Sequence, residues 1–122
     1  MNACIVYVTT STEKEAKDIA KSLVRKHLCA CVNIFSNTSS VYRWQGRVVE
    51  DKEASLIIKT TRALVPKVEQ YILSVHTYST PCIIELPVSS GNLKYLTWIE
   101  EECVEGEAEK EGAGQGNLLN EE

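Results

Sequence analysis

The chain has no long hydrophobic run. It has 122 residues, enough for about one domain with its own core. None of its apolar runs approaches the roughly 18 residues that cross a membrane as a helix. An apolar run, from Cys4 to Val8, begins at the fourth residue of the sequence and lacks the basic flank and the cleavage site of a secretion signal. We therefore expect neither a membrane span nor a secretion signal.

Net positive charge is also small outside the Glu-rich end of the chain. The formal net charge is -4, but the six Glu and one Lys between residues 104 and 122 carry -5, which leaves +1 on the rest. A nearly neutral body lacks the basic surface that attracts nucleic acid or an anionic membrane. The basic and aromatic pattern by which four-stranded sheets stack RNA bases is absent as well. We expect no nucleic-acid partner and no membrane partner.

Cysteines are present, but not in the pattern of a disulfide framework. There are five, at positions 4, 29, 31, 82 and 103, an odd number at irregular spacing. Such a set favours reduced thiols in a cytosol over the stapled scaffold of a small secreted protein. The sequence therefore predicts a cytoplasmic location.

The motifs of common enzyme families are missing too. The chain has no G-x-S-x-G elbow, no H-E-x-x-H pair, no glycine-rich phosphate loop and no Cys-His pair at a recognisable spacing. We predict a binding protein without catalytic residues.

What the sequence does contain is an alternation of strand and helix patterns. Strands are expected over residues 3–10, 30–35, 41–50, 54–60 and 82–88, with a turn at 50–52, and 41–50 is either separate or a continuation of 30–35. Helices are expected over residues 11–28, 64–75 and 91–103. Ser11 or Thr12 followed by Glu15 resembles an N-cap with a capping box, and Pro66 fits only in a first helical turn.

This order predicts an α+β fold of the ferredoxin-like βαββαβ type with an extra C-terminal helix. We expect one domain over residues 1–103 and a disordered, Glu- and Gly-rich tail over 104–122. Right-handed crossovers put both long helices on one face of the sheet. Apolar groups such as Phe35 and Tyr7 then fall on the uncovered face, which a single chain cannot hide. Self-association is the expected solution.

Six blocks of the sequence carry a family resemblance. In order from Ile5 to Glu102 they are VYVTTS, LCACVNIF, SSVYRWQGRVVED, SLIIKTT, VHTYSTPCIIELPV and GNLKYLTWIEEE. Together they resemble the CutA family, named for divalent-cation tolerance. The resemblance implies a tight homotrimer similar in architecture to PII signalling proteins, with sheets packed edge to edge and clefts between subunits.

The resemblance also implies which residues line those clefts. It places Tyr42, Trp44 and Lys59 at the subunit junction, with Tyr78 and Glu85 as further cleft residues. Two alternatives are open. The first is that Trp44 is an ordinary core residue and does not line a cleft. The second is that the clefts bind a small anionic ligand, as in PII-like relatives, and that metal binding is incidental.

A metal site is the other implication of the resemblance. Cys31 and His76 match family blocks, and a thiolate with an imidazole suits copper or another soft or borderline metal. Alternation on a strand would put Cys29 on the same side as Cys31, as a third ligand. Two of the three positions tied to copper in bacterial members resemble Val8 and Val75 here, so only one donor is retained. We predict a copper site of Cys31, His76 and Cys29.

Overall fold

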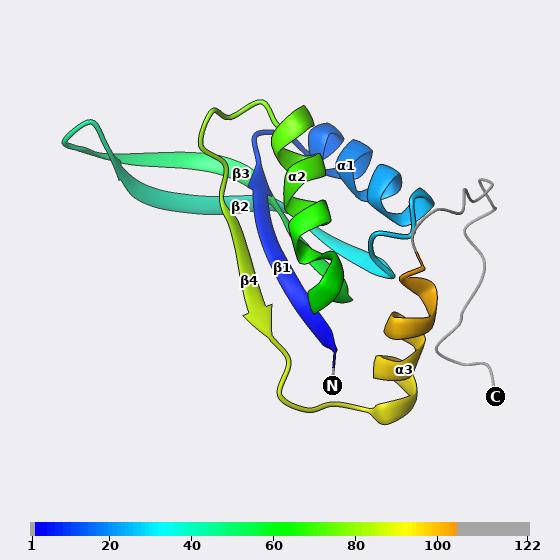
Figure 1. Ribbon diagram of the computed structural model, residues 1–122. Coiled ribbons are helices and arrows are strands. Elements are labelled where there is room, and N and C mark those ends of the chain that lie inside the picture. Colours follow the sequence, from blue (N-terminus) through cyan, green and yellow to red (C-terminus); the bar gives the residue numbers. More distant parts are fainter. Residues whose placement is uncertain (1, 105–122) are drawn as a thin grey trace.

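The computed structural model describes residues 2–104, so the predicted tail lies outside the described residues except for Val104. The order of elements agrees with the predicted α+β fold (Figure 1). The strands are β1 (Ala3–Thr10), β2 (Cys31–Trp44), β3 (Arg47–Thr61) and β4 (Ile83–Pro87). The helices are α1 (Glu13–Arg25), the short η1 (Arg62–Leu64), α2 (Val65–Val75) and α3 (Leu93–Glu102). None of the helices within residues 2–104 is long and apolar enough to cross a membrane.

The four strands form one antiparallel sheet in the order β2-β3-β1-β4, the ferredoxin-like topology. Both long helices, α1 and α2, cover the same face of this sheet (Figure 1), as predicted from the handedness of the crossovers. The main core lies between these two helices and the sheet. It joins Val6 and Val8 of β1, Leu56 and Ile58 of β3 and Leu23 of α1, all at most 1% exposed.

The helix starts follow the predicted local chemistry. Thr12 is the N-cap of α1, and its hydroxyl accepts a hydrogen bond from the Glu15 backbone N–H at 3.1 Å. Glu15 in turn accepts hydrogen bonds from the backbone N–H and hydroxyl of Ser11. Pro66 lies in the first turn of α2, where its missing N–H has no partner to lose. Both predictions are confirmed.

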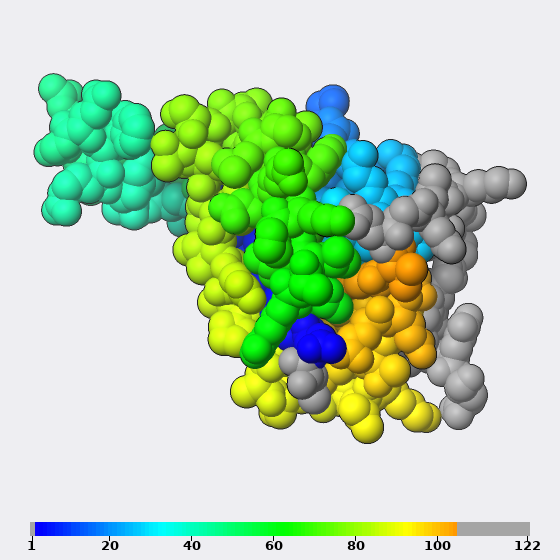
Figure 2. Space-filling view, viewed as in Figure 1, coloured from blue at the N-terminus to red at the C-terminus, as the bar shows by residue number. Residues whose placement is uncertain are grey.

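The β2–β3 hairpin corrects the predicted strand over residues 41–50. Residues 41–44 continue the preceding strand, through a bulge after Phe35 in which Asn37 has φ +59, whereas residues 47–50 lie in β3. The turn predicted at 50–52 is wrong, because these residues lie inside β3. The chain reverses at Gln45 and Gly46, whose φ values of +50 and +78 suit a tight two-residue turn. The hairpin consequently projects from the body of the molecule (Figure 2).

The sheet face opposite α1 and α2 stays largely uncovered. Phe35 of β2 is 52% exposed, and Ile84 and Leu86 of β4 are 52% and 46% exposed. The helix α3 covers only one end of the sheet, where Leu96 and Ile99 pack against Ala3. We call this exposed surface of Phe35, Ile84 and Leu86 the open face.

Candidate functional site

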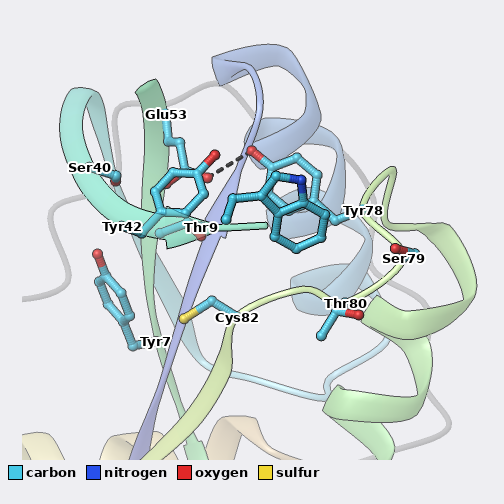
Figure 3. Close-up of a pocket in the computed structure, with 10 residues that line it drawn as sticks. Tyr7, Thr9, Ser40, Tyr42, Glu53, Tyr78, Ser79, Thr80 and Cys82 are labelled. Carbon is cyan, nitrogen blue, oxygen red and sulfur yellow. Dashed lines mark hydrogen bonds between the residues drawn. The ribbon is translucent and has the colours of Figure 1, made fainter. Parts of the chain in front are cut away.

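A pocket lies where the β2–β3 hairpin meets the loop between α2 and β4. Its volume is about 540 Å³, within the usual range for small-molecule sites. The lining comes from β1, β2, β3 and that loop (Figure 3): Tyr7, Thr9, Ser40, Tyr42, Trp44, Glu53, Tyr78, Ser79, Thr80 and Cys82. Three of the five predicted cleft residues, Tyr42, Trp44 and Tyr78, therefore line one pocket. Trp44 is 56% exposed, so the alternative that it is a core residue is wrong.

The hairpin and the loop are joined across this pocket by a hydrogen bond. The Tyr78 hydroxyl donates to Glu53 Oε2 at 2.7 Å (Figure 3), and the Tyr42 hydroxyl donates to Asp51 nearby. Burial raises the pKa of Tyr78, and the hydrogen bond to Glu53 raises this pKa further. Tyr78 therefore stays a neutral donor under ordinary conditions.

The loop itself is held against β1 by His76, whose side chain is fully buried. Its Nδ1 accepts a hydrogen bond from the Tyr78 backbone N–H at 3.0 Å. Its Nε2 consequently carries the hydrogen and donates it to the Thr9 carbonyl oxygen at 2.8 Å. Both ring nitrogens are thus engaged. A metal ligand role for His76 requires it to give up one of these bonds.

Glu15 forms a second anchor for the same loop. Its carboxylate accepts hydrogen bonds from the backbone N–H and the hydroxyl of Thr77, at 2.9 and 3.1 Å. It also lies 3.6 Å from His76 Nδ1. Glu15, in the first turn of α1, therefore fixes the segment that carries Tyr78 into the pocket.

The other two predicted cleft residues lie elsewhere in the chain. Lys59 donates to the Tyr95 hydroxyl at 3.0 Å, and its ammonium lies 5.2 Å from the centre of that ring, beside α3. Glu85 lies on β4 opposite Val6 and interacts with the Cys4 thiol. Neither lines the pocket, which leaves Glu53 as the charged side chain in its wall.

The predicted metal donors do not meet in one chain. Cys31 lies opposite Lys59 of β3, whereas His76 contacts Thr9, which lies opposite Ser55. Four residues of β3 separate the two levels, roughly 13 Å along the strand at 3.3 Å per residue. Among residues 2–104, no group of three or more His, Cys, Asp or Glu side chains could hold a metal ion.

Cys29 does not share the strand geometry expected for it. The strand β2 begins at Cys31, so Cys29 precedes it, and its side chain is 1% exposed within the main core. Burial raises the pKa of the Cys29 thiol, which opposes the thiolate that a metal needs. The expectation of a C-x-C pair on one side of a strand is wrong.

The described chain, from residue 4 to residue 102, matches the family of the CutA1 divalent ion tolerance protein. The chain belongs to this family. A divalent-cation tolerance protein CutA of Thermus thermophilus is 45% identical over 97 residues, which cover 80% of this chain and 94% of that protein. The human protein CutA is 43% identical over 95 residues, 78% of this chain and 53% of its own length. The chain thus spans about half of the human relative.

The solved structures agree with this family membership. The divalent cation tolerance protein of Thermus thermophilus superposes with a TM-score of 0.80 at 44% identity, covering 82% of this chain and 97% of that one. That agreement supports the fold as described above, including the antiparallel sheet and three helices.

Sequence reasoning missed the polar half of the pocket. Glu53 and Cys82 were not identified, although the alternation of β3 puts Glu53 on the same side as Asp51 and Ser55. The missing signal was the turn at Gln45 and Gly46, since it sets the register that brings Glu53 level with Thr38. With that register, Glu53 falls on the strand side that carries Tyr42.

Proposed function

We propose that the protein acts in divalent-cation tolerance as a homotrimeric, non-catalytic binding protein of the cytoplasm, and that it binds copper or another soft or borderline metal. Divalent-cation tolerance is the role named for the Thermus relative and for its solved structure. The observation that carries self-association is the open face, which no helix of the described chain covers.

The open face has the chemistry of a subunit interface. Phe35, Ile84 and Leu86 are each about half exposed, and they come from opposite borders of the same sheet. Large apolar side chains exposed on one face of a sheet favour an interaction site in a soluble protein. The strand β4 is also a sheet border with an unpaired side, which a neighbouring chain can extend by main-chain hydrogen bonds. The family resemblance supports three copies.

The metal site that we propose combines donors from more than one chain. Cys31 is a partly exposed thiol on β2, while His76 lies at the other end of the sheet in the same chain. A neighbouring subunit can bring the two together, and His76 must then exchange a hydrogen bond for a metal bond. We expect this exchange to limit the affinity to the micromolar range, about 8 kcal/mol.

Copper binding is tested by Cu(I) titration against a chromogenic competitor. Cys31→Ser removes the thiol, and His76→Gln keeps one acceptor and one donor for Thr9 and Tyr78 while removing the imidazole. Both variants should bind copper at least about tenfold more weakly, because each removes a soft or borderline ligand. Cys82→Ser, at a thiol of similar exposure, is the matched control and should bind like the wild type. Equal binding by all four proteins would refute this metal site.

Self-association is tested by light scattering. The wild type should have three times the 13.6 kDa mass of the chain. Ile84→Asp, which puts a charge on the open face, should lower this mass, because an unpaired buried charge is costly at an interface. Val48→Asp is the control, since Val48 is 74% exposed near the hairpin tip. A wild-type mass equal to one chain would exclude the trimer.

A further inference from the structure

We infer that the pocket between the β2–β3 hairpin and the loop of residues 76–82 binds a small free organic cation, an ammonium compound with short alkyl groups. The lining of this pocket contains neither Cys31 nor His76. Variants of the lining therefore test this site separately from the metal binding proposed above.

The pocket has the aromatic composition of an ammonium site. Four of its lining residues are aromatic: Tyr7, Tyr42, Trp44 and Tyr78. The rings of Tyr7, Tyr42 and Tyr78 lie around the same space (Figure 3). The negative face of an aromatic ring attracts a cation, most strongly where several rings surround a desolvated ammonium group. The volume of about 540 Å³ leaves room for a small molecule.

The charge of the pocket points to the same ligand. Glu53 is the charged residue of the lining, and it accepts a hydrogen bond from the neutral Tyr78 hydroxyl at 2.7 Å. Among the described residues, no Lys, Arg or His side chain belongs to the lining of this pocket. The adjacent Lys52 instead donates to Ser39 at 2.8 Å. A cationic ligand would supply the positive charge that the wall lacks.

The tyrosine hydroxyls add acceptors for such a ligand. The hydroxyl of Tyr78 donates its hydrogen to Glu53, and that of Tyr42 donates to Asp51. Each oxygen then keeps lone pairs that can accept from an N–H or O–H group of the ligand, such as the hydroxyl of choline. Burial raises the pKa of Tyr78, so its hydrogen remains in place to hold this arrangement.

The same residues disfavour two other ligand classes. An anion would meet Glu53 and no positive side chain in the lining. A bare metal ion would find one carboxylate and one thiol, and burial raises the pKa of that Cys82 thiol away from the thiolate form. The remaining competitor is a second copy of the chain that fills the pocket.

The test is calorimetric titration of the native oligomer with choline and with its uncharged isostere dimethylbutanol. We expect choline to bind at least about tenfold more tightly than the isostere, since the two differ in charge and hardly in shape. Glu53→Gln should weaken choline binding about tenfold, and Trp44→Leu should weaken it as well. Glu50→Gln is the matched control, because Glu50 lies on the same strand opposite Val41 and outside the lining.

Each outcome decides the inference once circular dichroism has shown that the variants fold. Preference for choline that is lost in Glu53→Gln and kept in Glu50→Gln supports an organic-cation site. Equal binding of choline and the isostere would overturn it in favour of an apolar pocket. No heat with either compound would also overturn it, and would indicate a pocket closed by another copy. Capture by phosphatidylcholine vesicles without binding of free choline would overturn the choice of a free ligand.

Discussion

Replacement of Glu15 by Gln should destabilise the fold by loosening the loop that carries Tyr78. The carboxylate accepts four hydrogen bonds, two from Ser11 at the start of α1 and two from Thr77 after α2. The side chain is only 11% exposed. Gln keeps one acceptor oxygen but places an NH₂ group against donors.

The expected loss is about 2 kcal/mol of the free energy of unfolding, since a hydrogen bond to a charged acceptor contributes roughly 1.5–3 kcal/mol and the four are not independent. Urea unfolding at a fixed protomer concentration measures it, because self-association makes the midpoint concentration-dependent. Glu69→Gln, at an exposed carboxylate of α2, is the control and should stay within about 0.5 kcal/mol of the wild type.

The stability that the Glu15 carboxylate contributes should depend on pH. Burial alone would raise the pKa of Glu15, but the hydrogen bonds from Thr77 and Ser11 outweigh it and hold the pKa below its usual value. A carboxyl group whose pKa is lowered on folding stabilises the folded protein fully at pH values above its unfolded pKa of about 4.3. This stabilisation is lost as the pH falls through the pKa of the folded state. The difference between wild type and Glu15→Gln should therefore be full at pH 7 and shrink under acid conditions. Equal stability of Glu15→Gln and Glu69→Gln at pH 7 would refute the reasoning.

Two further predictions concern the turn and the buried thiols. Gly46→Ala should lower the free energy of unfolding in urea by about 1 kcal/mol, because φ is +78 at this position and an added Cβ would contact no atom within 4 Å. Gln45→Gly should raise this free energy, because φ at Gln45 is +50, which glycine adopts without strain. Changes of the same sign in the two variants would contradict this. Burial raises the pKa of Cys4 to about 11 and raises that of Cys29 as well. Iodoacetamide at neutral pH should therefore modify Cys31 before Cys4 and Cys29 in the native protein, as read by peptide mass spectrometry; equal rates would contradict the burial.

The fold could be predicted because local and long-range signals agree along most of the chain. The cap at Thr12 predicts the start of α1, and Pro66 predicts the start of α2, and both helices then pack on the predicted sheet. The hairpin turn was harder, because Gln45 and Gly46 interrupt a strand pattern in which apolar and charged residues are mixed on both flanks. The reversal there is defined by the pairing of Trp44 with Arg47, which ends one strand and begins the next.

The site was predictable only in its aromatic half. Tyr42, Trp44 and Tyr78 were expected from the family resemblance, and they do line one pocket. Their polar partners were not, since Glu53 reaches Tyr78 across the gap between a hairpin and a loop far along the chain. The separation of Cys31 from His76 could not be predicted either, because sequence order does not give the distance between opposite ends of a sheet.

Native mass spectrometry of the protein with Cu(I) tests the trimer and its metal site together. We expect a species of three times 13.6 kDa that gains copper, and a Cys31→Ser protein that forms the same species without the gain. A single-chain species, or a three-chain species that takes up no copper, would contradict the proposed function.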